Sequence, residues 1–191
     1  MNKSLILASG SPRRKELLSQ LGYDFTIRIS DIEEQIQQGE LAKDYVMRLA
    51  QQKAEAVYSS LSSPDQATHQ VLGADTVVTI NNRVLEKPHN LEHSIEMLTE
   101  LSGRQHQVMT AVCVRNSVGT HCIICITDVW FKPISQQEIE QYWQTGEPCD
   151  KAGSYGIQGI GGKFVTRIEG SYHSVVGLPL YETEQLLHQF L

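Results

Sequence analysis

The stretch LILASGSPRR, residues 5–14, decides the fold of this chain, because an apolar run passes directly into a small-residue turn and a helix start. Residues 5–8 predict a buried strand and residues 12–21 a helix. Ser11 suits the N-cap, and Pro12 suits the first helical position, where its missing N–H costs nothing. The helix would then direct its free N–H groups and its positive dipole end at the turn, an arrangement that favours an anion.

Two adjacent arginines strengthen that prediction. Arg13 and Arg14 supply planar donors that match phosphate oxygens in pairs, which a lysine point charge does not. An ordinary strand-to-helix connection with solvated arginines fits the same spacing equally well. No Gly-Lys-Ser/Thr follows Gly10, so the turn is not a Walker loop.

Composition bounds the class of protein. The 191 residues suffice for one domain, which we expect to cover residues 1–191, since no linker or repeat is visible. The net charge of −6 argues against a nucleic acid polymer as partner. No apolar stretch is long enough to span a membrane, and residues 1–4 lead into a short apolar run and then into charge, so no signal-peptide core is expected. We therefore expect a cytoplasmic protein that binds a small anion.

The four cysteines are expected to be reduced thiols with structural roles. Cys122 and Cys125 have metal-ligand spacing, but residues three apart in a strand face opposite sides, and no second pair follows. Disulfides are not expected in a cytoplasmic chain of this size.

The remaining pattern mixes strands, hairpins and helices, which predicts an α/β fold with a mixed sheet. Strands are expected at 23–29, 71–80, 106–115, 121–131, 164–168 and 174–176, and helices at 41–61, from Asn90 to Leu101, after the capping box of Ser135 and Glu138, and at the C-terminus. Residues 59–70 are expected to form a loop, and Asn81-Asn82 a tight hairpin turn.

Two charges interrupt apolar segments. Lys53 falls in the apolar stripe of the helix at 41–61, where it either snorkels to water or points into a cleft toward an anion. Asp75 lies inside the nearly continuous apolar strand at 71–80, so it must be paired, bound to a metal or hydrogen-bonded by backbone N–H groups. We favour a functional site for Asp75.

Two further segments contribute polar groups. Pro88 limits the pairing of the preceding strand and places Lys87 at its end, near the edge of a cleft. The glycine-rich stretch 153–162 lacks the spacing of a dinucleotide fingerprint and could be a simple connection, yet the Gln158 amide suits the reading of a base edge.

Four ordered motifs resemble those of the Maf nucleotide pyrophosphatases across essentially the whole chain. They are SGSPRR at 9–14, GADT at 73–76, Lys87-Pro88, and DKAGSYGIQG at 150–159. The resemblance implies an elongated mixed β-sheet flanked by helices, with a central cleft. It also implies hydrolysis of a nucleoside triphosphate between the α and β phosphorus atoms, which releases a monophosphate and pyrophosphate.

The resemblance assigns roles to individual residues. It implies substrate binding by Ser9, Arg13, Arg14, Lys53, Thr76, Lys87 and Gln158, and it makes Asp75 the proton acceptor. Glu33 and Asp75 would hold a divalent metal cation, Mg, Mn or Co, while Asp31 and Glu34 remain alternatives to Glu33. Nearby cations are expected to lower the pKa of Asp75, so holding the metal and orienting water are its more secure roles.

The resemblance also indicates a base preference. The branch of the family that hydrolyses dTTP and UTP carries Arg, Thr and Gln at the positions of Arg13, Thr76 and Gln158, whereas the 7-methylguanosine-triphosphate branch has Trp, Gln and Glu. The expected substrate is therefore a pyrimidine nucleoside triphosphate: UTP, dTTP or a modified relative. The alternatives are a 7-methyl-GTP pyrophosphatase and a non-catalytic nucleotide sensor that regulates cell division. A homodimer is left open.

Overall fold

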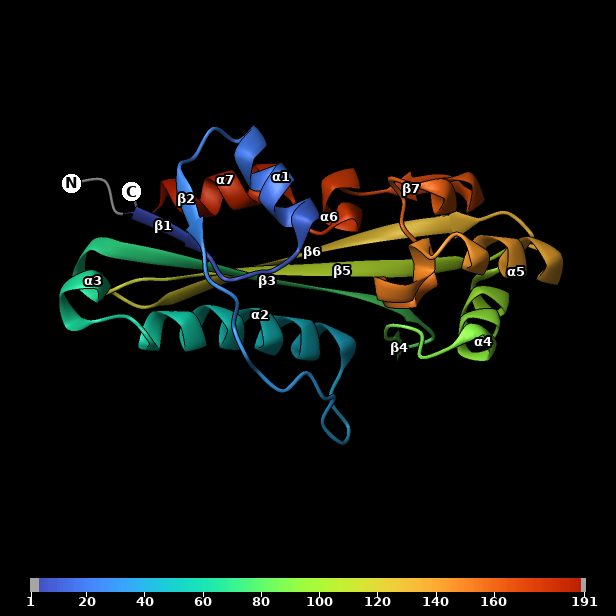
Figure 1. The fold of residues 1–191 in the computed structure, drawn as a ribbon, viewed down its shortest axis with the longest axis horizontal. Coiled ribbons are helices and arrows are strands. Elements are labelled where there is room, and N and C mark those ends of the chain that lie inside the picture. Colours follow the sequence, from blue (N-terminus) through green and yellow to red (C-terminus); the bar gives the residue numbers. More distant parts are fainter. Residues whose placement is uncertain (1–3, 190–191) are drawn as a thin grey trace.

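Seven strands form one mixed sheet in the computed structural model of the chain, which describes residues 4–189 (Figure 1). The strand order is β2-β1-β3-β5-β6-β7, and β4 pairs with β3. The first three strands in that order are parallel and every other pair is antiparallel. The strands are β1 (Ser4–Leu7), β2 (Phe25–Ile27), β3 (His69–Ile80), β4 (Arg83–Leu85), β5 (Gln105–Arg115), β6 (Thr120–Phe131) and β7 (Val165–Glu169).

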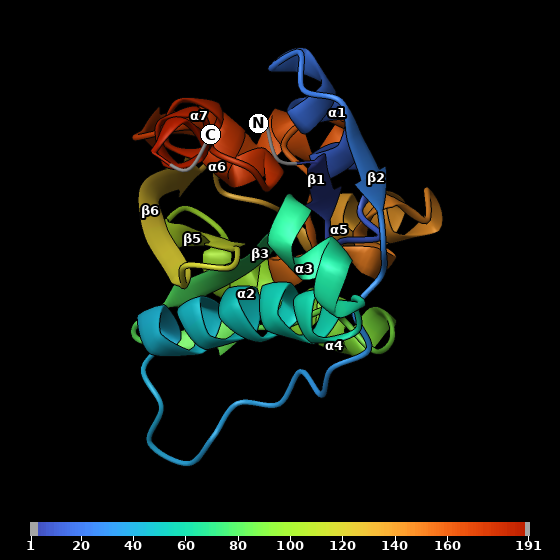
Figure 2. The ribbon, with the colours of Figure 1, turned by 90° about the vertical axis from the view of Figure 1, so that its left-hand side faces the viewer.

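Helices cover both faces of this sheet. The long helix α2 (Ala42–Ser59) lies on one face, and α1 (Pro12–Gln20), α6 (Tyr172–Val176) and α7 (Leu180–His188) lie on the other (Figure 2). At one end of the elongated molecule, α4 (Leu91–Leu101) and α5 (Gln136–Gln144) pack together. The expected α/β class, with an elongated mixed sheet flanked by helices, is confirmed. A single domain over residues 1–191 stays a prediction, and the expectation for Met1–Lys3 concerns residues outside those described.

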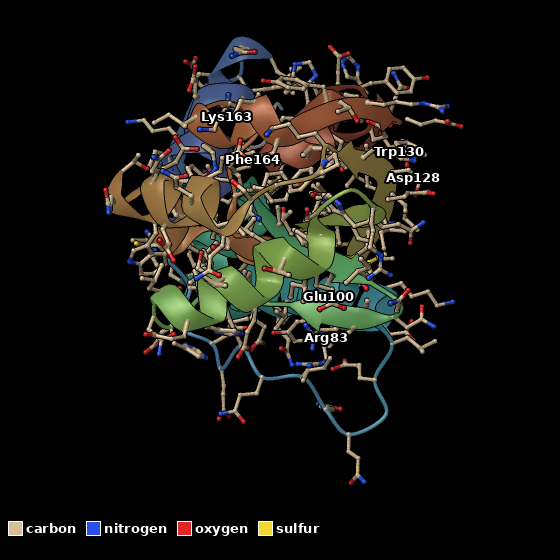
Figure 3. All side chains as sticks on the ribbon, turned by 90° about the vertical axis from the view of Figure 1, so that its right-hand side faces the viewer. Arg83, Glu100, Asp128, Trp130, Lys163 and Phe164 are labelled. Atoms are coloured by element: carbon tan, nitrogen blue, oxygen red, sulfur yellow. A yellow bond between two sulfur atoms is a disulfide. The ribbon has the colours of Figure 1, made fainter. Side chains whose placement is uncertain are left out.

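The local signals act as expected at several element ends. The Ser11 hydroxyl accepts from the N–H of Arg14 at 3.5 Å, and Pro12 opens α1. Asn81 and Asn82 both adopt positive φ angles, 51° and 62°, as a tight hairpin between β3 and β4 requires. The far side of this hairpin is tied to α4 by an ion pair between Arg83 and Glu100, which Figure 3 shows at the end of the molecule.

Two expected assignments are wrong. The stretch 59–70 is not a simple loop, because Ser62 caps the short helix α3 (Ser63–Thr68), and Pro64 lies in its first turn. Residues 174–176 belong to α6 rather than to a strand. Ser171 caps that helix by accepting from the N–H of Ser174 at 3.1 Å, and this local cap outweighs the weak, context-dependent β-propensity of Val175 and Val176.

The expectation of reduced cysteines is wrong for one pair. Cys113 on β5 and Cys122 on β6 stand directly opposite each other in the antiparallel register and form a disulfide. The pairing brings them together although nine positions separate them in the sequence, so sequence spacing alone concealed it. Cys125 and Cys149 are free.

One close approach positions the centre of the molecule. A Cβ atom on Gly73 of β3 would lie 2.6 Å from the backbone nitrogen of Ala54 and would also clash with the Ala50 carbonyl. Glycine therefore lets α2 lie directly against the strand. This contact sets the distance between Lys53 on the helix and Asp75, two residues further along the strand. None of the helices within residues 4–189 is long and apolar enough to cross a membrane.

Candidate active site

A gap in strand pairing creates the central cleft. β1 pairs with β3 along His69–Leu72, and β4 pairs with it along Val78–Ile80. Between these stretches, no strand among the described residues pairs with this side of β3. The opening forms a pocket of about 770 Å³, lined by the turn after β1, by α2, by the end of β4 and by the glycine-rich stretch after α5.

A cluster of three charged side chains lies at this opening, two of them buried. The Nζ atom of Lys53 lies 2.7 Å from Oδ1 of Asp75 and 2.6 Å from Oε1 of Glu34. Lys53 and Asp75 are only 8% and 7% exposed. Lys53 therefore directs its ammonium into the cleft, and this contact replaces the snorkelling alternative.

The electrostatics of the two carboxylates differ. Burial raises the pKa of Asp75, and the nearby charges of Lys53 and Arg14 oppose this shift without cancelling it. The expected effect of the cations is present, but desolvation exceeds it. At Glu34 burial also acts to raise the pKa, yet the hydrogen bond from Lys53, with the charges of Lys87 and Arg14, lowers the pKa overall.

Arg14 is held in place by three acceptors from distant parts of the chain. Its Nε donates to the carbonyl of Gly177 at 2.9 Å, its Nη2 to Oγ1 of Thr76 at 3.0 Å, and its Nη1 to Oγ of Ser9 at 3.4 Å. Ser9 also accepts from the N–H of Ser11 at 3.2 Å. Burial lowers the pKa of Arg14, since the charged form loses water. Arg14 thus joins the turn after β1 to β3 and to the end of α6.

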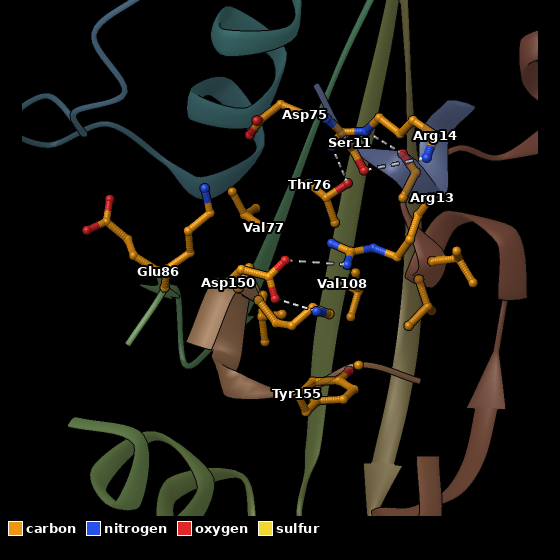
Figure 4. A pocket seen from close by; sticks show the side chains of 18 of the residues that line it. Ser11, Arg13, Arg14, Asp75, Thr76, Val77, Glu86, Val108, Asp150 and Tyr155 are labelled. Atoms are coloured by element: carbon orange, nitrogen blue, oxygen red, sulfur yellow. Dashed lines mark hydrogen bonds and ion pairs between the residues drawn. The ribbon is translucent and has the colours of Figure 1, made fainter. Parts of the chain in front are cut away.

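Arg13 points elsewhere. Its Nη1 lies 3.9 Å from Oδ2 of Asp150, on the opposite wall of the cleft, and Figure 4 shows these two side chains facing each other while Arg14 is directed at Thr76. Asp150 also pairs with Lys151. Because the side chain of Asp150 is 69% exposed, this long ion pair is weak and a ligand phosphate could displace it.

Lys87 and Gln158 line the same pocket, both on its exposed rim. The loop that carries Gln158 is fixed by Glu147, which lines the pocket as well. The carboxylate of Glu147 accepts from the N–H groups of Ile160 at 2.8 Å and Gly161 at 3.0 Å, and from the hydroxyl of Tyr142 at 2.7 Å.

The structure brings together every predicted site residue except Glu33. Ser9, Arg13, Arg14, Lys53, Asp75, Thr76, Lys87 and Gln158 all line the cleft. Glu33 instead lines a separate hollow beside Arg48 and Glu55. Adjacent residues of an extended segment point to opposite sides, so Glu34, one of the open alternatives, is the one that reaches Lys53 and Asp75.

Sequence reasoning missed several groups that shape the site. Glu147 and the carbonyl of Gly177 lie in loops whose contacts are non-local, and only the motif that begins at Asp150 gave a signal nearby. Thr110 on β5 pairs in register with Thr76, a relation that depends on knowing which strands are neighbours. None of these groups could be found from periodicity.

The fold and the site define an α/β protein with a central cleft, in which the turn that carries Arg13 and Arg14 faces the buried Asp75 and the more exposed Glu34. Residues 4–190 match the family described as Maf-like protein, and the chain belongs to that family. It is 65% identical to a dTTP/UTP pyrophosphatase of Vibrio parahaemolyticus over 188 residues, and this match covers 98% of this chain and 97% of the relative. It is 61% identical to one of Vibrio vulnificus over 98% of both chains, and 56% identical to one of Aliivibrio fischeri over the full length of both.

Proposed function

We propose that this protein is a nucleoside triphosphate pyrophosphatase that hydrolyses dTTP and UTP to the monophosphate and pyrophosphate. The observation that carries the proposal is the cluster of Lys53, Asp75 and Glu34 at the opening in β3, opposite the turn that holds Arg13 and Arg14. The relatives named above, which carry this activity in their names, support the proposal.

The positions of the charged residues indicate which of them bind the substrate and which acts on the attacking water. Lys87 is free to bind the phosphates because it lies on the exposed rim, and Arg13, which is held only by a long ion pair, is free to turn toward the substrate. The leaving pyrophosphate carries most of the developing charge, and cations fixed in a cleft stabilise it. Asp75 accepts a proton from the attacking water at the α-phosphate.

The carboxylates also suit a divalent cation. No three His, Cys, Asp or Glu side chains gather into a ready-made metal site within residues 4–189. Mg²⁺, however, needs only one or two carboxylates when substrate phosphates supply further ligands. Asp75 and Glu34 already converge on one cation, the ammonium of Lys53, so we assign the metal to these two residues in place of Glu33. A bound Mg, Mn or Co would polarise the α-phosphoryl group.

Base selection falls to Arg13, Thr76 and Gln158, which line the cleft from three different elements. Gln158 lies on the rim and Thr76 is held in place by its hydrogen bonds, so a pyrimidine ring fits between these two residues. For the remaining expectations, a cytoplasmic location follows from the pool of nucleoside triphosphates on which such an enzyme acts, and a homodimer is a prediction that light scattering tests.

The experiment is a screen for pyrophosphate release. Purified protein is given UTP, dTTP, CTP and 7-methylguanosine triphosphate, each with and without Mg²⁺ or Mn²⁺. We expect release from UTP and dTTP that depends on the cation. Binding of UTP without release would favour a nucleotide sensor, and preferential release from 7-methylguanosine triphosphate would favour the other branch of the family.

A further inference from the structure

Thr76, which lines the cleft, is bonded to a fully buried neighbour. Its Oγ1 lies 2.9 Å from Oγ1 of Thr110, the residue directly opposite it on β5. The hydroxyl of Thr110 in turn lies 2.7 Å from the backbone carbonyl oxygen of Ser174 in α6. Thr110 itself is completely buried and does not line the pocket.

These contacts fix which atom donates in each hydrogen bond from Thr76 through Thr110 to Ser174. A carbonyl oxygen only accepts, so Thr110 must donate its single proton to Ser174. Thr110 then has no proton left for Thr76, and the hydroxyl of Thr76 must donate to Thr110. The guanidinium of Arg14 carries only donor groups, so Arg14 donates to the same Thr76 oxygen at 3.0 Å.

Thr76 is left with one free lone pair and no free proton. A threonine hydroxyl ordinarily donates or accepts as its partner requires, but here the hydrogen bonds with Thr110 and Arg14 remove that choice. Toward the cleft, Thr76 can only accept. A ligand group that also only accepts would face it without a hydrogen bond, and such mismatches are costly in a partly buried site.

We propose that Thr110 is a positioning residue for base specificity, because it makes Thr76 an obligate acceptor that selects the N3–H group of uracil and thymine. Uracil and thymine present a donor at N3 between two carbonyl oxygens, whereas cytosine presents an acceptor at N3. Arg13 and the amide N–H of Gln158 supply the donors that the two carbonyl oxygens require. This inference rests on the proposed function, in which Thr76 reads the base.

The test compares kcat/KM for UTP and CTP in Thr110→Val and Thr110→Ser. Valine keeps the volume and removes the hydroxyl, which frees the Thr76 proton to donate. We expect Thr110→Val to lower the UTP-to-CTP preference about tenfold. Thr110→Ser keeps the hydroxyl and should retain the preference of the unmodified protein. A merely structural role for Thr110 would lower both activities together and leave their ratio unchanged.

A matched control lies on the same sheet. Thr79 on β3 is buried, lies outside the pocket, and its hydroxyl has no hydrogen-bond partner among the described residues. Thr79→Val therefore makes the same chemical change without touching the chain of hydroxyls, and should leave the UTP-to-CTP preference unaltered.

A second measurement needs no variant. The triphosphate of N3-methyluridine keeps both carbonyl oxygens and replaces the N3 hydrogen with a methyl group, and the unmodified protein should use it at least about tenfold less efficiently than UTP. Equal use of the two, or an unchanged UTP-to-CTP ratio in folded Thr110→Val, would overturn the inference. If the unmodified protein releases no pyrophosphate from UTP, the proposed function itself fails, which is a different result.

Discussion

Lys53 of α2 and Asp75 of β3 are joined by a hydrogen-bonded ion pair of 2.7 Å whose two side chains are each only 10% exposed.

The first prediction removes the carboxylate charge. Asp75→Asn should lower kcat about 100-fold or more, because the amide cannot accept the proton of water. Burial raises the pKa of Asp75, so its ionised form opposes folding, and the midpoint of thermal unfolding should stay level or rise. A well-folded variant with nearly normal turnover would contradict the assignment.

The second prediction removes the cation. Lys53→Met keeps the helix stripe apolar but leaves Asp75 buried without its partner, which should abolish activity and destabilise the fold by about 3 kcal/mol at neutral pH. Without the ammonium the pKa of Asp75 rises further, so the deficit should grow as the pH rises and shrink toward pH 5. The double variant Lys53→Met/Asp75→Asn should recover stability but not turnover. Unchanged kinetics in Lys53→Met would show that the lysine only packs.

The third prediction concerns the base. Replacement of Arg13, Thr76 and Gln158 by Trp, Gln and Glu should shift preference from UTP and dTTP toward 7-methylguanosine triphosphate by about tenfold or more, since each unpaired polar group costs about 1 to 3 kcal/mol. The measurement is kcat/KM for the three nucleotides in the triple variant and in the unmodified protein. A preference of the unmodified protein for the methylated purine would refute the branch assignment.

The fourth prediction concerns the support of the loop that carries Gln158. Glu147→Gln keeps the shape but gives up the charge that accepts from Ile160, Gly161 and Tyr142. We expect a higher KM for UTP with inhibition by inorganic pyrophosphate unchanged, because the phosphate side of the cleft is untouched. Glu140→Gln on α5, whose carboxylate accepts from Gln136, is the matched control and should behave as the unmodified protein. Parallel losses of pyrophosphate binding and of base preference would contradict a local effect.

The fifth prediction is a pH dependence of stability. Burial lowers the pKa of His106 to about 4, and its Nε2 lies 2.8 Å from the hydroxyl of Tyr155. The unfolded chain binds this proton near pH 6.5 and the folded chain only near pH 4, so stability is lost as the pH falls through that window. The loss amounts to about 3 kcal/mol and then levels off. Chemical unfolding of His106→Gln between pH 7 and 4 should show a flatter profile than the unmodified protein or the exposed control His188→Gln.

Much of the fold could be predicted because its signals are local. The N-cap of α1, the Asn81-Asn82 turn and the capping box of α5 depend on residues a few positions apart, and each is confirmed. The failures have equally physical causes. The valines of α6 have high β-propensity and therefore predicted a strand in place of the helix. The disulfide between Cys113 and Cys122 depends on a strand register that no local pattern reveals.

The site was predictable where a residue contradicts its surroundings. Lys53 and Asp75 stand out because a charge in an apolar segment needs a partner, and the structure makes them partners. Glu34 could not be separated from Glu33 in an irregular segment that has no period. Thr110 gave no signal, since a buried threonine in a strand is ordinary until the register shows that Thr76 lies opposite it.

The uncovered stretch of β3 has a consequence for association between molecules. Unpaired strand edges are where one chain can add its backbone to the sheet of another and begin aggregation. Here the opening is short, and an incoming strand would have to strip water from Asp75 and Glu34 and displace the contacts of Lys53. The charges of Lys53, Asp75 and Glu34 therefore also oppose strand addition at this opening, so variants that neutralise them should be tested for polymerisation as well as for lost activity.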